Sequence, residues 1–389
     1  MTREVIRAVW HTISELPTAL SLLLVLGLIA LTLSRIRGKS SASIARWGAL
    51  ILVVFAFVDW GLLTALPLLD LSFGPVGLPL LGITIVRCSF IWMSHRLWLI
   101  MGSLKETNVS ETSHGSFVVS MLILQLLITG CEVNGLYFEP FNVGITSVEI
   151  PAETQSNGQE LKIVQLSDLH MEYITKRERQ VVEQVMGLKP DLIVLTADFL
   201  NTSYTYDDET HTDLRWVLSQ LEAPYGIYAI RARNVDPPEV VEPMFKELGI
   251  RFLDDEVEQI EIGKQTLHIV GVTFLDRGRD AQILHELASQ LPANDSSLLL
   301  YHTPDLIETA AEVGIDLYLA GHTHGGQVRL PWFGAIVTAS SYWKRFEQGY
   351  YEVGETVMYV SRGIGLEGHG APRVRFLCPP EVVEVRWRL

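Results

Sequence analysis

The sequence has little cysteine, with only three in 389 residues. Cys88, Cys131 and Cys378 are scattered, odd in number and lack the spacing of a metal-binding motif. This pattern argues against a disulfide framework and against a thiolate metal site, and it leaves the cellular compartment open.

Positive charge is also scarce, because 30 Lys and Arg face 45 Asp and Glu and the formal net charge is −15. No basic stripe or arginine-rich arm is present, so a nucleic-acid partner is not expected. The chain has no Gly-Lys-Ser/Thr phosphate loop and no Ser-His-Asp or Cys-His nucleophile motif. Clustered carboxylates remain, either as a cation site or as a solvated acidic surface.

Long apolar runs dominate residues 1–135 and predict a transmembrane region of four helices, at about 16–33, 47–69, 75–101 and 117–131. The first run is long for a signal peptide and lacks a convincing cleavage site, so we expect a retained anchor. Two charged residues, Asp59 and Arg87, interrupt the second and third runs. They are either a functional intramembrane pair or charges that lie near an interface or face neighbouring helices.

The loop after the first run is rich in Lys and Arg, whereas the loop between the second and third runs has neither. The positive-inside rule then places the first loop in the cytoplasm. With four spans, the multi-pass chain has its N-terminus and its C-terminal domain on the extracytoplasmic side of the cell membrane. With three spans, the domain faces the side opposite the N-terminus.

We assign residues 136–160 to a linker and a first strand, and residues 161–389 to an α/β domain. The run 161–166 has the length and composition of a buried strand. Strands and helices then alternate, with predicted strands at 190–198, 225–230, 266–272, 297–300, 315–320, 356–360 and 381–387. Predicted helices lie at 176–186, 214–221, 238–248, 283–290 and 305–313.

Polar side chains follow several of these strands. Asp168 and His170 follow the first strand, and the strand at 190–198 ends in Asp198. Later strands are followed by Asn234, His302, His322 and His324. The segment Gly321–Gly326, with two histidines two apart, is the most specific signal, because a structural histidine usually stands alone. The carboxyl ends of strands are where open α/β sheets bind ligands.

These residue types suit two hard or borderline divalent cations. One bridging carboxylate holds such ions roughly 3.5–4 Å apart in two-metal phosphatases, and Asp198 is the natural bridge. The other interpretation of Asp198 is a helix or turn cap.

The order Asp168-x-His170, Asp198, Asn234, His302 and Gly321-His322-Thr323-His324 resembles the calcineurin-like metallophosphoesterase family, from about residue 161 to the C-terminus. The ending at 321–331 is similar to its membrane-associated bacterial branch, which includes UDP-2,3-diacylglucosamine pyrophosphohydrolases and cell-wall phosphodiesterases. The resemblance implies a four-layer α/β/β/α sandwich and two metal ions. One ion would take Asp168, His170, Asp198 and His324; the other would take Asp198, Asn234, His302 and His322.

The third motif departs from the family pattern of Gly-Asn-His-Asp or Glu. Here it reads Arg233-Asn234-Val235-Asp236, so Val235 replaces the family's catalytic histidine. Loss of general-acid help costs typically about 10²- to 10⁴-fold in rate. Arg362 and His369, in or beside a glycine-rich loop, are candidate substitutes. Ala197 also stands where the family has Gly.

The expected function is a membrane-anchored phosphohydrolase with two divalent ions such as Mn, Fe or Zn. It would cleave a phosphodiester, phosphomonoester or pyrophosphate bond, of a lipid- or wall-linked substrate, through a metal-activated hydroxide. The alternative is a catalytically weakened domain that binds metal and phosphate as a sensor or scaffold, and Val235 is its support. A transporter function is remote because intramembrane polar residues are few and no inverted repeat is apparent. No protein partner is evident.

Overall fold

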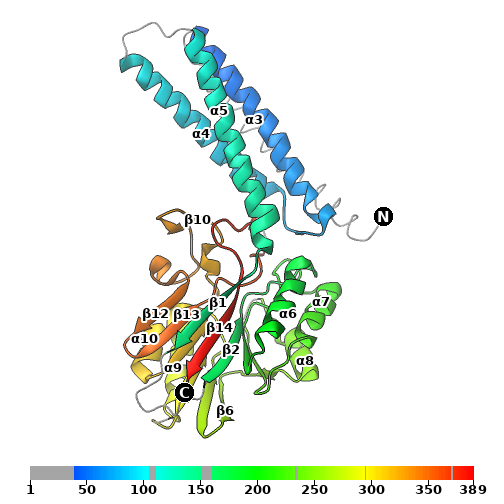
Figure 1. Ribbon diagram of the computed structural model, residues 1–389, viewed down its shortest axis with the longest axis vertical. Helices are drawn as coiled ribbons and strands as arrows, with labels where there is room; N and C mark the ends of the chain where they lie inside the picture. Colours follow the sequence, from blue (N-terminus) through cyan, green and yellow to red (C-terminus); the bar gives the residue numbers. More distant parts are fainter. Residues whose placement is uncertain (1–38, 105–110, 151–159, 233–234, 294, 369–370) are drawn as a thin grey trace. The chain divides into compact units, whose positions relative to one another are not determined.

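The computed structural model describes residues 39–104, 111–150, 160–232, 235–293, 295–368 and 371–389. The first predicted membrane span, Asn234 and His369 lie outside these residues. The chain divides into two compact units, one of residues 1–137 with 369–373 and one of residues 138–368 with 374–389 (Figure 1).

Within its described residues, the N-terminal unit contains three long helices, α3 (Lys39–Ala65), α4 (Gly77–Leu104) and α5 (Glu111–Val133). The stretches Arg46–Ala65, Gly77–Trp98 and Gly115–Phe141 are long and apolar enough to cross a membrane, with mean hydropathies of 2.1, 1.5 and 1.9. α3 ends before the predicted residue 69, because Pro67 begins a separate short 3-10 helix, Pro67–Leu69. α5 begins six residues before the predicted run, since the polar segment at its start is helical as well.

A buried arginine joins the three helices of this unit. Arg87 on α4 donates to both carboxylate oxygens of Asp59 on α3, at 2.7 and 2.6 Å. On α5 it donates to the Gln125 backbone and side chain, to Thr129 and to Glu132, at 2.8–3.2 Å. Arg87 and Asp59 therefore face neighbouring helices and satisfy each other. Charge-assisted, bidentate contacts of this kind fix geometry strongly, and removing one partner would leave a buried charge uncompensated.

The C-terminal unit contains two six-stranded sheets, in the orders β1-β14-β2-β3-β4-β5 and β12-β13-β9-β8-β7-β6. The first sheet consists of β1 (Gly144–Ile150), β2 (Glu160–Leu166), β3 (Leu192–Thr196), β4 (Ile227–Ile230), β5 (Arg251–Phe252) and β14 (Glu381–Arg388). The second consists of β6 (Glu256–Ile262), β7 (Gln265–Gly271), β8 (Ser296–Leu300), β9 (Leu317–Ala320), β12 (Gly349–Val353) and β13 (Thr356–Val360). Strands β2 to β5 run parallel, as do β7, β8, β9 and β13.

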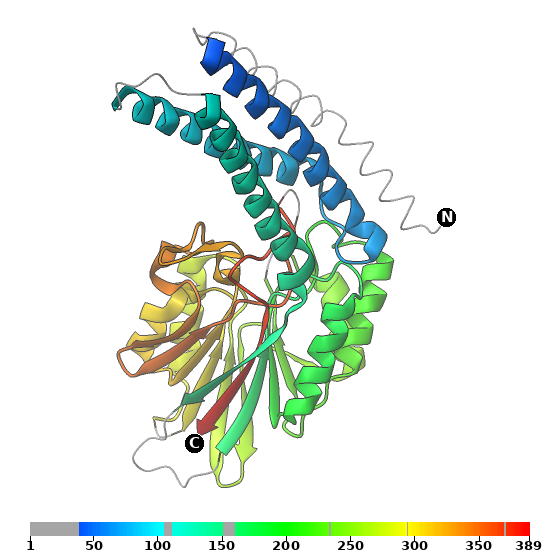
Figure 2. The ribbon, with the colours of Figure 1, turned by 45° about the horizontal axis from the view of Figure 1, so that its top comes forward.

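Three hydrophobic cores separate four layers (Figure 2). One core lies between the sheets. A second lies under α6 (Lys176–Leu188), α7 (Asp208–Ser219) and α8 (Pro238–Leu248), and a third under α9 (Arg277–Ala288) and α10 (Ile307–Val313). Successive strand residues face opposite sides, so Ile163 enters the inter-sheet core and Val164 the core under the helices. Because they are covered on both faces, the central strands are mostly apolar. The predicted α/β/β/α sandwich is confirmed.

Several boundaries differ from the sequence prediction. Residues 136–160, assigned to a linker and first strand, include β1, which pairs in parallel with β14 along its whole length. The helices α7 and α9 each begin six residues earlier than predicted, because Asp207 and Asp276 accept hydrogen bonds from first-turn N–H groups. The antiparallel edge strands β6 and β12 were not predicted. Their alternating exposed polar residues give them little apolar signal.

The parallel strands β2, β3 and β4 and the parallel strands β8 and β9 deliver their carboxyl ends to one end of the two sheets. Each is followed there by a short loop instead of a helix. This is the end at which the chain gathers its predicted ligands.

Candidate metal centre

The six described candidate ligands come from four strand ends. Asp168 and His170 follow β2, Asp198 follows β3, His302 follows β8, and His322 and His324 follow β9. The first three arrive from one sheet and the histidines of β8 and β9 from the other. Asn234, predicted after β4, lies outside the described residues.

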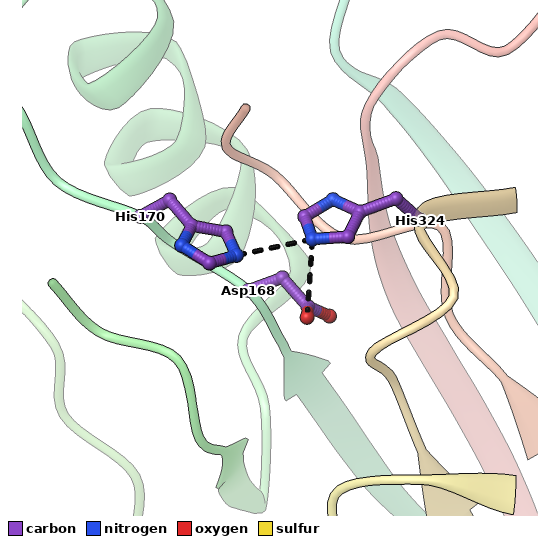
Figure 3. A group of neighbouring side chains, drawn as sticks. All are labelled: Asp168, His170 and His324. Atoms are coloured by element: carbon purple, nitrogen blue, oxygen red, sulfur yellow. Dashed lines mark hydrogen bonds and ion pairs between the residues drawn. The ribbon is translucent and has the colours of Figure 1, made fainter. Parts of the chain in front are cut away.

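One group consists of Asp168, His170 and His324, all buried, with ligand atoms within 4.8 Å of one another. The Nε2 atoms of His170 and His324 are 3.0 Å apart, and Asp168 Oδ1 lies 3.5 Å from His324 Nε2 (Figure 3). In Figure 3 the two rings and the carboxylate point toward a common centre. This group therefore presents two nitrogens and an oxygen to one point.

A second group consists of Asp198, His302 and His322 and meets the same 4.8 Å limit. His322 Nδ1 lies 3.0 Å from His302 Nε2, which is 3.3 Å from Asp198 Oδ2. His302 Nδ1 lies 2.8 Å from the carbonyl oxygen of Thr196 and donates its proton there, so Nε2 is the nitrogen that faces the site.

Asp198 links the two groups. Its Oδ2 is 3.3 Å from His170 Nε2 in the first group and 3.3 Å from His302 Nε2 in the second. Its Oδ1 is buried and has no hydrogen-bond partner among the residues that the structure describes. The Asp198 carboxylate therefore lies between two sets of imidazoles, and its Oδ1 is left for a further ligand.

The donor set fits divalent cations. Imidazole nitrogens 3.0 Å apart repel each other unless a proton or a cation lies between them. Both pairs lie beside carboxylates, and of the four rings only His322 is half-buried instead of buried. Nitrogen and oxygen ligands without thiolate suit borderline or hard divalent ions. A cation in each group would satisfy the converging lone pairs and the open oxygen of Asp198.

Burial and charge shift the pKa values of these groups in opposite directions. Burial, reinforced by Asp198, raises the pKa of Asp168 to about 6. Although burial opposes it, the nearby His302 and His170 lower the pKa of Asp198. Burial also opposes the charged form of His302, but Asp198 and Asp168 raise its pKa to about 10, whereas burial and His302 lower the pKa of His322 to about 4. Groups packed so closely cannot all hold their ordinary charges.

The backbone at these strand ends is strained. Five of the six described candidates have φ between 40° and 68°, namely Asp168, His170, Asp198, His322 and His324, and Ala197 has φ 73°. The left-handed region costs a residue with a side chain roughly 1–2 kcal/mol. Such strain gathers at functional sites, where surrounding contacts hold it in place.

Asp236 holds the loop of Asp198, although sequence analysis gave it no role. Its buried carboxylate accepts hydrogen bonds from the backbone N–H groups of Asp198 and Phe199, both at 2.8 Å, and of Ala232 at 3.3 Å. Burial and the charge of Asp198 raise the pKa of Asp236 to about 7. The sequence feature that could have identified Asp236 is its place at the end of the altered third motif.

Close packing fixes the loop of Asp168. Ser167 donates to Asp168 Oδ2 at 2.6 Å, and the backbone N–H of His322 donates to both carboxylate oxygens at 3.0 and 3.1 Å. A Cβ at Gly321 would lie 1.9 Å from Ser167 Oγ and 2.4 Å from Asp168 Oδ2, so only glycine fits there. The motif's glycine therefore brings β9 against the end of β2.

Of the two candidate substitutes for the missing histidine, the structure describes only Arg362. Arg362 forms an ion pair with buried Glu381 at 2.6 Å, which commits its guanidinium to a structural contact. Val235 is half-buried and brings no polar side-chain atom. Glu367, which sequence analysis did not single out, extends a carboxylate oxygen to 3.9 Å from His324 Nε2. His369 lies outside the described residues.

A four-layer sandwich with carboxylates and imidazoles in two linked groups is the arrangement of a metal-dependent phosphohydrolase. No family model matches the chain. It is 32% identical over 254 residues to the uncharacterized metallophosphoesterase YkuE of Bacillus subtilis, covering 63% of this chain and 86% of that protein. It is 30% identical over 233 residues to phosphodiesterase YaeI of Escherichia coli, covering 59% and 82%. The chain belongs to the metallophosphoesterase family.

More distant similarity extends to named pyrophosphatases. UDP-2,3-diacylglucosamine pyrophosphatase LpxG of Chlamydia trachomatis is 26% identical over 280 residues, covering 58% of this chain and 83% of that protein. Matched solved structures include a dimetal phosphatase from Danio rerio, at 10% identity and a TM-score of 0.35, covering 52% of this chain and 88% of that one. Family membership implies dependence on divalent metal and phosphohydrolase activity.

Removing one histidine of the second group should weaken metal binding. We expect His302→Ala to lower affinity for manganese by more than the roughly 10- to 100-fold that outer contacts contribute, because a nitrogen ligand and its link to Asp198 are lost. Elemental analysis after dialysis against manganese measures the change. The control is His268→Ala, a buried histidine paired with Asp295 at 2.9 Å. Equal metal content in both variants and the parent chain would contradict the assignment.

Proposed function

We propose that this chain is a membrane-anchored, two-metal phosphoesterase that hydrolyses a phosphodiester, phosphomonoester or pyrophosphate bond of a lipid- or wall-linked substrate. The observation that carries the proposal is the position of Asp198 Oδ2, 3.3 Å from an imidazole of each ligand group. A shared carboxylate is what two-metal phosphatases use to hold their ions together.

Each residue has a role in this proposal. Asp168, His170, Asp198 and His324 would hold one ion, and Asp198, Asn234, His302 and His322 would hold the other. Bound divalent ions supply Lewis-acid charge for the phosphoryl oxygens and lower the pKa of a water ligand. Manganese, iron and zinc all suit the nitrogen and oxygen donors.

The chain's own contacts keep these donors in place. Ser167 and the His322 N–H orient the carboxylate of Asp168, and the Thr196 carbonyl sets the tautomer of His302. Asp236 holds the backbone of Asp198. Such preorganisation matters because phosphoryl transfer depends mainly on positioning and electrostatic stabilisation.

Two observations support a membrane-borne substrate. The three apolar helices have the length and composition to keep the chain at a bilayer. The relative LpxG carries the name UDP-2,3-diacylglucosamine pyrophosphatase, so its named substrate is a diacylated nucleotide sugar. A phosphate ester attached to lipid or to the wall is therefore the substrate class that we propose.

We also propose that the chain is multi-pass with its catalytic unit on the extracytoplasmic side. Support comes from the Lys and Arg of residues 35–46, set against the loop at 70–74 that has none. A membrane-impermeant thiol reagent should label Lys264→Cys, an exposed position, in intact cells, in a background without Cys88 and Cys131. Labelling only after lysis would reverse the proposed orientation.

Metal-dependent turnover is the direct test of the proposed activity. Full-length protein, stripped with chelator and given manganese, should hydrolyse a bis-nitrophenyl phosphate diester, and Asp198→Asn should lose most of this activity because both ligand groups lose their shared anion. Released nitrophenol measures the rate. Absence of metal-dependent turnover there and on a panel of diesters, monoesters and pyrophosphates would refute the enzyme assignment.

Metal binding without turnover would favour the second candidate, a domain that binds metal and phosphate in a sensing or scaffold role. The observation behind this candidate is Val235, whose side chain has no proton to give to a leaving group. In the phosphoesterase proposal the same residue limits the enzyme to good leaving groups, such as those of diphosphates.

Restoring the imidazole should separate these interpretations. Val235→His should raise kcat on an alkyl phosphate diester by up to about 10²- to 10⁴-fold, because a general acid matters most for a poor leaving group. The gain on a nitrophenyl diester should be much smaller. Val235→Ala is the matched control for a change in packing alone. A similar effect of Ala and His, or no gain on the alkyl ester, would refute the account of the missing acid.

A further inference from the structure

A segment next to the metal centre differs from the rest of the chain in composition. Residues 327–345 contain Arg329, Lys344 and Arg345 and no Asp or Glu, although the whole chain has 45 acidic residues. The same segment exposes six large apolar side chains: Leu330 (45%), Trp332 (104%), Phe333 (57%), Ile336 (44%), Val337 (61%) and Trp343 (55%). Contiguous exposed apolar surface on a folded domain marks an interaction site.

These side chains are exposed on an ordered frame. β10 (Arg329–Leu330) and β11 (Gly334–Ala335) form a short antiparallel hairpin, with Trp332 in its turn at φ 62°. Buried Glu347 fastens its base, since it pairs with Arg329 at 2.8 Å and accepts from the Ala335 N–H at 3.1 Å. We call residues 328–337 the β10–β11 hairpin.

The hairpin is built directly onto the loop of His324. Arg329 donates to the Gly325 carbonyl at 2.9 Å, and Thr323 donates to the Glu347 carbonyl at 2.7 Å. A Cβ at Gly326 would lie 2.5 Å from Ala335 Cβ, so backbone and hairpin are in close contact there. The base of the hairpin is therefore fixed to the loop that carries His324.

The chemistry of the segment matches a bilayer interface. Tryptophan is enriched at the boundary between head groups and acyl chains, and Lys or Arg beside such apolar residues attract anionic lipid. Lys344 Nζ lies 3.6 Å from the centre of the Phe333 ring and 3.4 Å from Glu347 Oε1, so this lysine and Arg329 share one carboxylate and the three basic side chains outnumber it. Arg345 is exposed, and its contact with Glu308, 3.7 Å between two exposed side chains, leaves it available to phosphate groups.

We propose that the β10–β11 hairpin and Trp343 insert into the head-group region of a phospholipid bilayer and hold the metal centre at the lipid surface. The inference deepens the proposed function and rests on its membrane attachment. It gives the enzyme access to a phosphate ester whose acyl chains stay in the bilayer.

Lipid quenching tests the insertion without relying on catalysis. The full-length chain, with Cys88 and Cys131 changed to Ala, carries Trp332→Cys labelled with a bimane fluorophore. It is reconstituted into phosphatidylcholine vesicles whose acyl chains are brominated. The matched control is Lys264→Cys, exposed in the turn between β6 and β7 at the other end of the sheet (Figure 1). We expect several-fold stronger quenching at position 332 than at position 264.

The charge of the segment is tested in the same vesicles. Adding phosphatidylglycerol should strengthen quenching at position 332, and Lys344→Gln with Arg345→Gln should remove that increase. Equal quenching at 332 and 264, in a chain that floats with the vesicles, would overturn the inference and leave the proposed attachment intact. Cross-linking of two copies through position 332 would also overturn it, in favour of self-association. A chain that does not float would refute the attachment and this inference together.

Discussion

The carboxylate of Asp198 is the contact on which the candidate site depends. One of its oxygens faces an imidazole from each ligand group, and its backbone is held by the buried carboxylate of Asp236. These two acids would repel each other if both were charged, and burial together with the charge of Asp198 raises the pKa of Asp236. The repulsion is tolerated because backbone N–H groups donate to Asp236 and imidazoles face Asp198.

The same site concentrates backbone strain. Five candidate ligands adopt left-handed φ values that side chains disfavour, and glycine at 321 lets β9 approach the end of β2. Two sheets whose central strands are buried on both faces hold these ends rigidly, so the strain persists. A scaffold of this kind places ligands from distant parts of the chain within a few ångströms of each other. Preorganised groups then need little rearrangement when charge develops on a phosphate.

The N-terminal unit also buries charged and polar side chains, but there they hydrogen-bond to one another. Arg87 is enclosed by Asp59 and by polar groups of α5, so its contacts are saturated and bind the three helices to each other. At the candidate metal centre, by contrast, nitrogens face nitrogens, and one oxygen of Asp198 has no partner in the part of the chain that the structure describes. A buried charged group whose hydrogen bonds are made stabilises the fold. Converging nitrogen and oxygen atoms without partners instead indicate a binding site for a ligand.

The sequence by itself determined the alternation of strands and helices, the apolar N-terminal region, and the positions of Asp168, His170 and the His322–His324 pair at strand ends. These follow from local patterns: buried parallel strands are apolar runs, and ligands stand where the runs stop. Edge strands β6 and β12 escaped prediction because their exposed faces carry polar residues. The support from Asp236, the ion pair of Arg362 with Glu381 and the exposed tip at Trp332 were decided only by the tertiary structure. Each depends on which distant segment packs against it, and periodicity along a chain holds no information about that neighbour.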